Sequence, residues 1–218
     1  MDIRVYIKFG QKEHLEKMQK EGLFYCNTIT FFSKLEDDLR GDPFESVSKL
    51  KYYEKAIFQL KPVNEPSAEW KSLNANDVLY KEHFEEPLGN LFCMSAFKMT
   101  PKKEISLFNF DERFLEKFEY CLMILRQDLF IERLQLALAK LEFKTCIKLV
   151  EYYNLHKFSG SKTLFQKDIK YNWQEELRIV LYTDKYEMND PYRFSIGSIE
   201  DISEIIDLKK TKKLEYKY

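Results

Sequence analysis

The stretch KYNWQEELRIVLY (residues 170–182) begins with polar and aromatic residues and ends in an apolar run. If it is extended, successive side chains point to opposite faces. One face then carries Gln174, Glu176 and Arg178, and the other is apolar from Leu177 onward. The pattern predicts a strand with one face in the core. Its other face opens with a row of hydrogen-bonding groups that could meet a ligand.

The rest of the chain indicates an α+β fold. Alternating apolar residues predict a strand at 3–9, and a short apolar run between Gly89 and Pro101 predicts a buried strand at 90–99. A helix is expected at 11–22 with Gly22 at its end. Asp111 can cap a helical middle segment that runs through residues 112–125 and 127–143. Strands on both sides of a helical middle favour a mixed or antiparallel central sheet. With no linker in sight, residues 1–218 are predicted to form a single α+β domain.

Composition excludes several classes of protein. Thirty-five Lys and Arg residues against 36 Asp and Glu leave a net charge of -1, which gives no reason to expect strong non-specific binding of nucleic acid. Four scattered cysteines and three histidines indicate neither a zinc site nor a disulfide framework. No window approaches ~18 apolar residues and no signal sequence begins the chain, so we expect no membrane span and a cytoplasmic location.

Two further groups of residues are candidates for ligand binding. In RGDPFES (residues 40–46), a glycine and a proline fold the backbone around Arg40, Asp42 and Glu45, which can converge on a ligand or simply form a charged turn. In FCMSAF (residues 92–97), Cys93 and Ser95 share one face of the expected strand. A structural alternative is open for the first row too, since Glu176 and Arg178 can form a same-face ion pair.

The order of these motifs resembles a family of uncharacterised proteins from bacteria and their phages. The matching features are Gly22, DPFE (residues 42–45), FCMSAF, and FQKDIKYNWQEELRIVL (residues 165–181), which corresponds to a late Lys…Trp-x-x-Glu-x-Arg strand. The resemblance covers most of the chain and implies a role in conflict between bacteria and phages. It does not imply a particular activity.

A second resemblance concerns mechanism. ADP-ribosyltransferases of the Arg-Ser-Glu class hold NAD with an early arginine, a serine on a middle strand and a late Gln/Glu-x-Glu motif. Arg4, Ser95 and the pair Gln174 and Glu176 occur here in that order. By this resemblance Arg4 contacts phosphate, Ser95 braces the site, Glu176 binds ribose and stabilises the cation, and Gln174 orients the acceptor. Arg178, two residues after Glu176, completes the candidate catalytic row.

Three functions follow as hypotheses. The first is an NAD-dependent transferase of the ADP-ribosyl type, with a nucleotide as ligand and a protein or nucleic acid as acceptor. The second is a metal-dependent nuclease or phosphodiesterase that uses Asp42, Glu45, Glu175 and Glu176, because clustered carboxylates bind Mg²⁺. The third is a non-enzymatic interaction protein of defence or counter-defence, in which the many aromatic residues form a partner surface.

Overall fold

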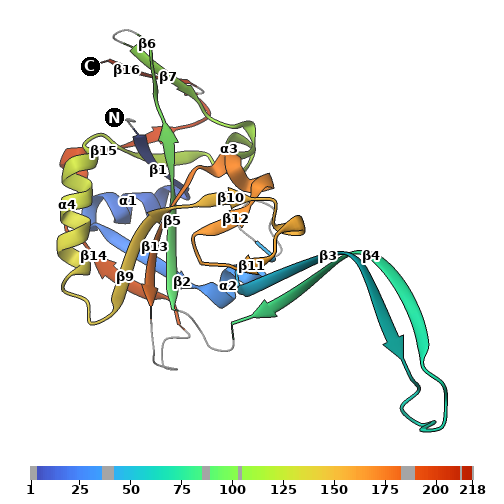
Figure 1. Cartoon of the computed structure of the whole chain (residues 1–218). Coiled ribbons are helices and arrows are strands. Elements are labelled where there is room, and N and C mark those ends of the chain that lie inside the picture. Colours follow the sequence, from blue (N-terminus) through green and yellow to red (C-terminus); the bar gives the residue numbers. More distant parts are fainter. Residues whose placement is uncertain are drawn as a thin grey trace.

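The central sheet is antiparallel, as the computed structural model of the chain shows for residues 4–35, 42–84, 89–102, 105–182, 190–211 and 213–217. Its neighbouring strands run in the spatial order β9 (Lys144–Leu149), β13 (Glu176–Tyr182), β5 (Asn90–Lys98), β1 (Arg4–Gly10), β8 (Tyr120–Ile124) and β15 (Ser203–Asp207) (Figure 1). Each neighbouring pair is antiparallel. With helices packed beside this sheet, the α+β prediction is confirmed.

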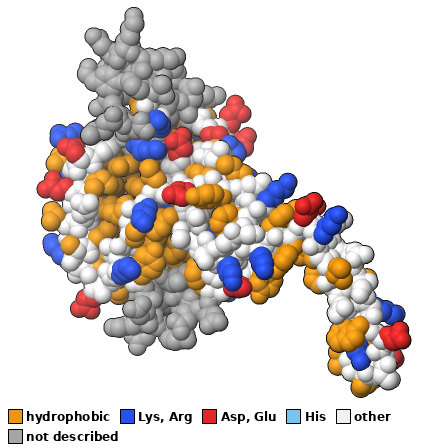
Figure 2. All heavy atoms as spheres, in the orientation of Figure 1, with side chains coloured by type: hydrophobic (Ala, Val, Ile, Leu, Met, Phe, Trp, Pro, Cys, Tyr) orange, Lys and Arg blue, Asp and Glu red, His pale blue; other side chains and the backbone are white. Residues whose placement is uncertain are grey.

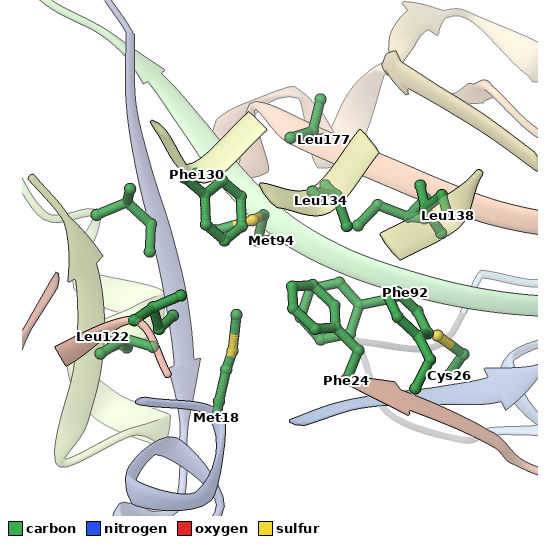
Figure 3. Close-up of a cluster of buried hydrophobic side chains, with 14 of the residues drawn as sticks. Met18, Phe24, Cys26, Phe92, Met94, Leu122, Phe130, Leu134, Leu138 and Leu177 are labelled. Atoms are coloured by element: carbon green, nitrogen blue, oxygen red, sulfur yellow. The ribbon is translucent and has the colours of Figure 1, made fainter. Parts of the chain in front are cut away.

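One face of the sheet packs on the main hydrophobic core. The helices α1 (Lys12–Glu21) and α4 (Gln127–Leu138) contribute to this core. Two more strands, β2 (Leu23–Thr28), which pairs with β5, and β14 (Tyr192–Ser195), which pairs with β2, belong to the same sheet and add Phe24, Cys26 and Phe194 to the core. Figure 3 shows Phe130, Leu134 and Leu138 of α4 directed toward Met94 and Phe92 of β5. Leu177 of β13 belongs to the same core, as the apolar face predicted for this strand requires. Burial of this one face fixes the register of β13, because a slip by one residue would turn its charged side chains into the core.

The predicted end of the first helix is confirmed. Gly22 has a left-handed backbone with φ 59°, which an L side chain rarely adopts. A Cβ atom there would also lie 1.9 Å from the backbone oxygen of Gly197. Glycine is therefore required at this position for both reasons.

Smaller clusters cover the opposite face of the sheet. Phe9 of β1 stacks on Phe114 of α3 (Glu112–Lys117), with 4.0 Å between ring centroids. Nearer β9, Leu91 and Val180 pack with Ile29 of α2 (Ile29–Lys34). Polar and charged residues of β5 and β13 lie between these two apolar clusters, and they form the site described below.

A long hairpin projects from this body (Figure 1). It consists of β3 (Val47–Leu60) and β4 (Lys71–His83), paired antiparallel. Its base packs through Phe44, Val47 and Leu50 against Leu155. The short strand β11 (Gly160–Ser161) adds to the base of β3. The remaining short elements are β6 (Thr100–Lys102), β7 (Ile105–Asn109), β10 (Glu151–Tyr153), β12 (Gln166–Asp168) and β16 (Lys213–Lys217), with 3-10 helices η1 (Leu155–Lys157), η2 (Ile169–Gln174) and η3 (Glu200–Ile202).

Two local predictions were wrong. The helix expected over 112–125 stops at Lys117, and Tyr120–Ile124 is strand β8, although Asp111 caps the helix as predicted by accepting from the backbone N–H of Arg113. Pairing with β1 on one side and β15 on the other outweighs the helical spacing of these apolar residues. Residues 169–174 form η2 and not extended chain, so Gln174 is not on the strand.

Candidate functional site

Arg178 is the centre of a buried group of charges on the face of β13 opposite the main core. Its guanidinium holds Glu45 with both terminal nitrogens, at 2.5 Å from Nη1 to Oε1 and 3.0 Å from Nη2 to Oε2. Its Nε donates to Oε1 of Glu176 at 2.8 Å, and Nη1 also donates to the backbone oxygen of Leu164. Side-chain exposure is 1% for Arg178 and 2% for Glu45. Such a fork requires the planar geometry of arginine and would not survive replacement by lysine.

Lys167 extends this group on the other side of Glu176. Its Nζ lies 3.1 Å from Oε2 of Glu176 and donates to the side-chain oxygen of Gln174 at 2.7 Å. The backbone N–H of Glu176 donates to the hydroxyl of Tyr152 at 2.9 Å. We call Glu45, Lys167, Gln174, Glu176 and Arg178 the ionic cluster.

Electrostatics keep Glu176 ionised. Burial alone would raise the pKa of this carboxyl, but the charges of Arg178 and Lys167 outweigh burial and hold the pKa well below its usual value. Burial also opposes the charge on Lys167, yet the neighbouring carboxylates, led by Glu176, raise the pKa of that ammonium. On the adjacent strand, burial and the charge of Glu176 raise the pKa of the Cys93 thiol. This environment favours the neutral form of the Cys93 thiol.

Asp42 borders the ionic cluster. Its Oδ1 accepts from the backbone N–H of Phe44 at 2.9 Å, which tightens the DPFE turn. Its Oδ2 is buried and has no hydrogen-bond partner among the described residues. Burial, followed by the charge of Glu45, raises the pKa of Asp42. The turn thus directs Glu45 toward Arg178 while Asp42 supports the backbone.

The two motifs of the first resemblance meet in space through this cluster. Asp42 and Glu45 of the DPFE turn contact or adjoin Glu176 and Arg178 of the late strand, far away in the chain. The ion pair between Glu176 and Arg178, one of the alternatives open from the sequence, is present. It lies in the interior and not at an exposed strand edge, because β13 is paired with β5 and β9 on its two sides.

Two of the other predicted site residues, Ser95 and Arg4, lie on the neighbouring strands β5 and β1. Ser95 is buried on β5, opposite Glu176 of β13 and Ile7 of β1 in the strand register. Arg4 begins β1 and lies beside Glu175, with 3.7 Å between Nη1 and Oε2. Arg40 lies outside the described residues.

Glu175, which the sequence offered only as one of four carboxylates for a metal ion, occupies an unusual position in the structure. It has a left-handed backbone with φ 40° and ψ 54°, which is uncommon for a residue with a side chain. Its Oε2 accepts from the backbone N–H of Lys98 at 2.9 Å, and its backbone oxygen accepts from Ala96. The side chain is 40% exposed, against 7% for Glu176. The one signal in the sequence was a charged residue on the otherwise apolar face of the expected strand.

An open cleft lies beside Glu175. It has a volume of about 650 Å³. Arg113 holds Asp111 through two 2.8 Å contacts, and its guanidinium lies 4.0 Å from the ring centre of Trp173. The lining combines aromatic and mostly acidic side chains: Phe97, Phe110, Asp111, Glu112, Arg113, Glu116, Trp173 and Glu175. We call this region the edge cleft.

Neither region suits a metal ion by its protein ligands. Within the part of the chain that the structure describes, no group of three His, Cys, Asp or Glu side chains is arranged to hold one. Glu45 and Glu176 are both ion-paired with Arg178.

No helix among the described residues is long and apolar enough to cross a membrane.

Comparisons with known proteins identify no relative: the chain matches no family model, no curated protein and no solved structure. The chemistry of the site therefore has to be argued from its own residues.

Proposed function

We propose that the protein is an NAD-dependent transferase of the ADP-ribosyl type. One observation carries the proposal: the strands that bear Arg4, Ser95 and Glu176 are direct neighbours in the sheet, in the order β1, β5, β13. The first residues of β1 and β13 and the last residues of β5 lie at the same end of these three strands. The edge cleft lies at this end, with Glu175 in its lining.

The edge cleft offers suitable contacts for the nicotinamide end of NAD. The pyridinium ring is flat and positively charged, and aromatic faces bind flat cations well. The Arg113 guanidinium lies 4.0 Å from the ring centre of Trp173, so this ring already holds one flat cation, and the pyridinium would take the place of that guanidinium. Four carboxylates in the lining, Asp111, Glu112, Glu116 and Glu175, favour a cation over an anion there. The pyrophosphate would lie on the Arg4 side of the cleft, where the Arg4 guanidinium is 3.7 Å from Glu175.

In this proposal Glu175 takes the role that the resemblance gave to Glu176. The bond between C1 of the ribose and the pyridinium nitrogen breaks, and nicotinamide leaves with the electron pair. The remaining sugar cation is stabilised by a nearby carboxylate until a nucleophile of the acceptor adds to C1 and loses its proton. An exposed carboxylate can approach that cation, whereas a carboxylate enclosed by Arg178 and Lys167 cannot.

Glu176 then acts as a positioning residue. Its ion pairs and its backbone bond to Tyr152 fix the first residue of β13, and therefore the strained turn that presents Glu175. Ser95 packs beside it on β5. Gln174 is engaged by Lys167 in the interior, so an acceptor-orienting role for it has no support.

The metal-dependent nuclease is the weaker alternative. It needs Asp42, Glu45, Glu175 and Glu176 around one metal ion, but Glu45 and Glu176 are both ion-paired with Arg178. The acceptor and the role in conflict between bacteria and phages stay hypotheses that rest on the resemblances alone.

Tryptophan fluorescence tests NAD binding directly, because the chain has only two tryptophans. Trp173 lines the edge cleft, and Trp70 is exposed near the end of the hairpin. In the Trp70→Phe variant, titration with NAD should change the remaining Trp173 emission saturably. The matched Trp173→Phe variant should show no such change from Trp70. Constant Trp173 emission, together with no heat of NAD binding by calorimetry, would remove the basis of the proposal.

A further inference from the structure

The hairpin of β3 and β4 has one apolar face along its outer part. Cross-strand partners share a face, and the register pairs Phe58 with Leu73 and Ala56 with Ala75. Leu60, two residues beyond Phe58, continues the same face. We call these five residues the distal stripe. Phe58, Leu60 and Leu73 are 46%, 53% and 52% exposed, and Figure 2 shows hydrophobic side chains gathered on this part of the hairpin.

The reverse face of the hairpin is mostly polar. Its cross-strand pairs are Lys55 with Asn76 and Gln59 with Ser72, and Ile57 pairs with Asn74. Apolar and polar side chains therefore alternate along the hairpin, as in a sheet that is solvent-exposed on one face and packed against another layer on the other. The covering layer is missing, since the outer hairpin projects away from the body (Figure 1). A bare two-stranded hairpin is only marginally stable in water, so an apolar layer on this face would stabilise it.

We propose that the distal stripe is an interface between two copies of this chain, packed face to face about a two-fold axis with the hairpins antiparallel. Two neighbouring cross-strand pairs form the centre of the stripe: the small pair Ala56 and Ala75, and the large pair Phe58 and Leu73. A two-fold axis that passes between these two pairs places the large pair of one copy on the small pair of the other. Large-on-small packing fills the interface without gaps, and the same patch serves both copies, as two-fold symmetry requires.

Charge agrees with the same arrangement. Glu54 lies at the inner end of the stripe by alternation, and Lys71 lies at the outer end opposite Leu60. The two-fold axis that places the large pair on the small pair also brings Glu54 of each copy beside Lys71 of the other. A parallel arrangement would set like charges against each other, which disfavours it. Size and charge therefore select the same antiparallel pairing, and no partner other than the chain itself is needed to satisfy them.

The first test compares two adjacent residues that lie on opposite faces. Sedimentation of the full chain should show a monomer–dimer equilibrium at micromolar concentration, because the stripe is smaller than a standard dimer interface. Phe58→Asp should weaken dimerisation by on the order of 30-fold or more. Ile57→Asp is the matched control, since Ile57 is more exposed, at 70%, but faces the other way; it should leave the equilibrium unchanged. A monomer at every concentration, or equal effects of the two substitutions, overturns the proposal.

The second test fixes the geometry. Glu54→Lys alone and Lys71→Glu alone should each weaken the dimer, whereas a mixture of the two variants should form the heterodimer, with both charge pairs restored. Failure of the mixture to associate while the wild type dimerises would overturn the antiparallel arrangement. Phe58→Asp should still bind NAD as the wild type does, so failure of this inference and failure of the proposed function are distinguishable.

Discussion

Glu175 and Glu176 are joined by one peptide bond and belong to two different regions of the molecule. Glu176 lies in the ionic cluster, enclosed by Arg178 and Lys167, while Glu175 faces the edge cleft from a left-handed backbone. The comparison shows that a buried, fully paired carboxylate and a more exposed carboxylate on a strained backbone can be neighbours in the chain. We propose that the ionic cluster stabilises the fold and that the edge cleft binds the substrate.

The largest expected effect comes from breaking the ionic cluster. Arg178→Met leaves Glu45 and Glu176 buried without their main partner, and removal of one partner from a buried pair costs about 3–5 kcal/mol of unfolding free energy. Denaturant unfolding measures this loss. The control is Arg193→Met, at an exposed position of β14, where we expect a change within about 1 kcal/mol. Equal, small losses in both variants would mean that the cluster does not hold the fold.

The second effect is on the pH dependence of stability. The pKa of Glu176 is lowered by Arg178 and Lys167, so the stabilising contribution of this residue is present above its unfolded pKa and is lost as the pH falls. Between roughly pH 5 and pH 3 the wild type should lose up to about 1.4 kcal/mol per pH unit from this group. The pKa of Asp42 is raised, so the contribution of Asp42 to the unfolding free energy increases as the pH falls. This contribution is the same in the wild type and in a variant changed only at Glu176.

Comparison with Glu176→Gln isolates this contribution. The variant should be less stable than the wild type at neutral pH and should show a shallower loss in acid. Parallel curves for the two proteins would contradict the assignment of a lowered pKa to Glu176.

The smallest effect is expected at Glu175. Glu175→Gly relieves the left-handed strain but removes the bond to Lys98, so unfolding free energy should change by no more than about 1 kcal/mol in either direction. The same denaturant experiment checks it. A loss as large as that of Arg178→Met would place Glu175 among the residues that hold the fold, and the contrast between the two regions would disappear.

Sequence periodicity was sufficient to predict those helices and strands whose packing in the fold follows the same periodicity. The apolar face of β13, the strands β1 and β5, and the glycine end of α1 follow from alternation and local backbone preference. It failed at Tyr120–Ile124, where the spacing of apolar residues suits a helix and two flanking strands decide otherwise. At β4, which begins at Lys71, cross-strand pairing with β3 likewise forms the strand.

The candidate site was predictable only in part. The charged row and the DPFE turn were identified from the sequence. Which of the two glutamates is exposed could not be predicted, because it depends on the left-handed backbone of Glu175 and on the ion pair between Lys167 and Glu176. The contribution of Trp173 and Arg113 to a cleft depends on α3 packing beside η2, a long-range contact.

The most direct test of the central claim is the release of nicotinamide from NAD, with water as acceptor, by the wild type and by Glu175→Gln. We expect measurable release by the wild type and a loss on the order of 100-fold or more in Glu175→Gln, with its unfolding free energy nearly unchanged. Release at an undiminished rate by Glu175→Gln would contradict the assignment of Glu175. No release by a folded wild type that also fails to bind NAD would contradict the transferase itself.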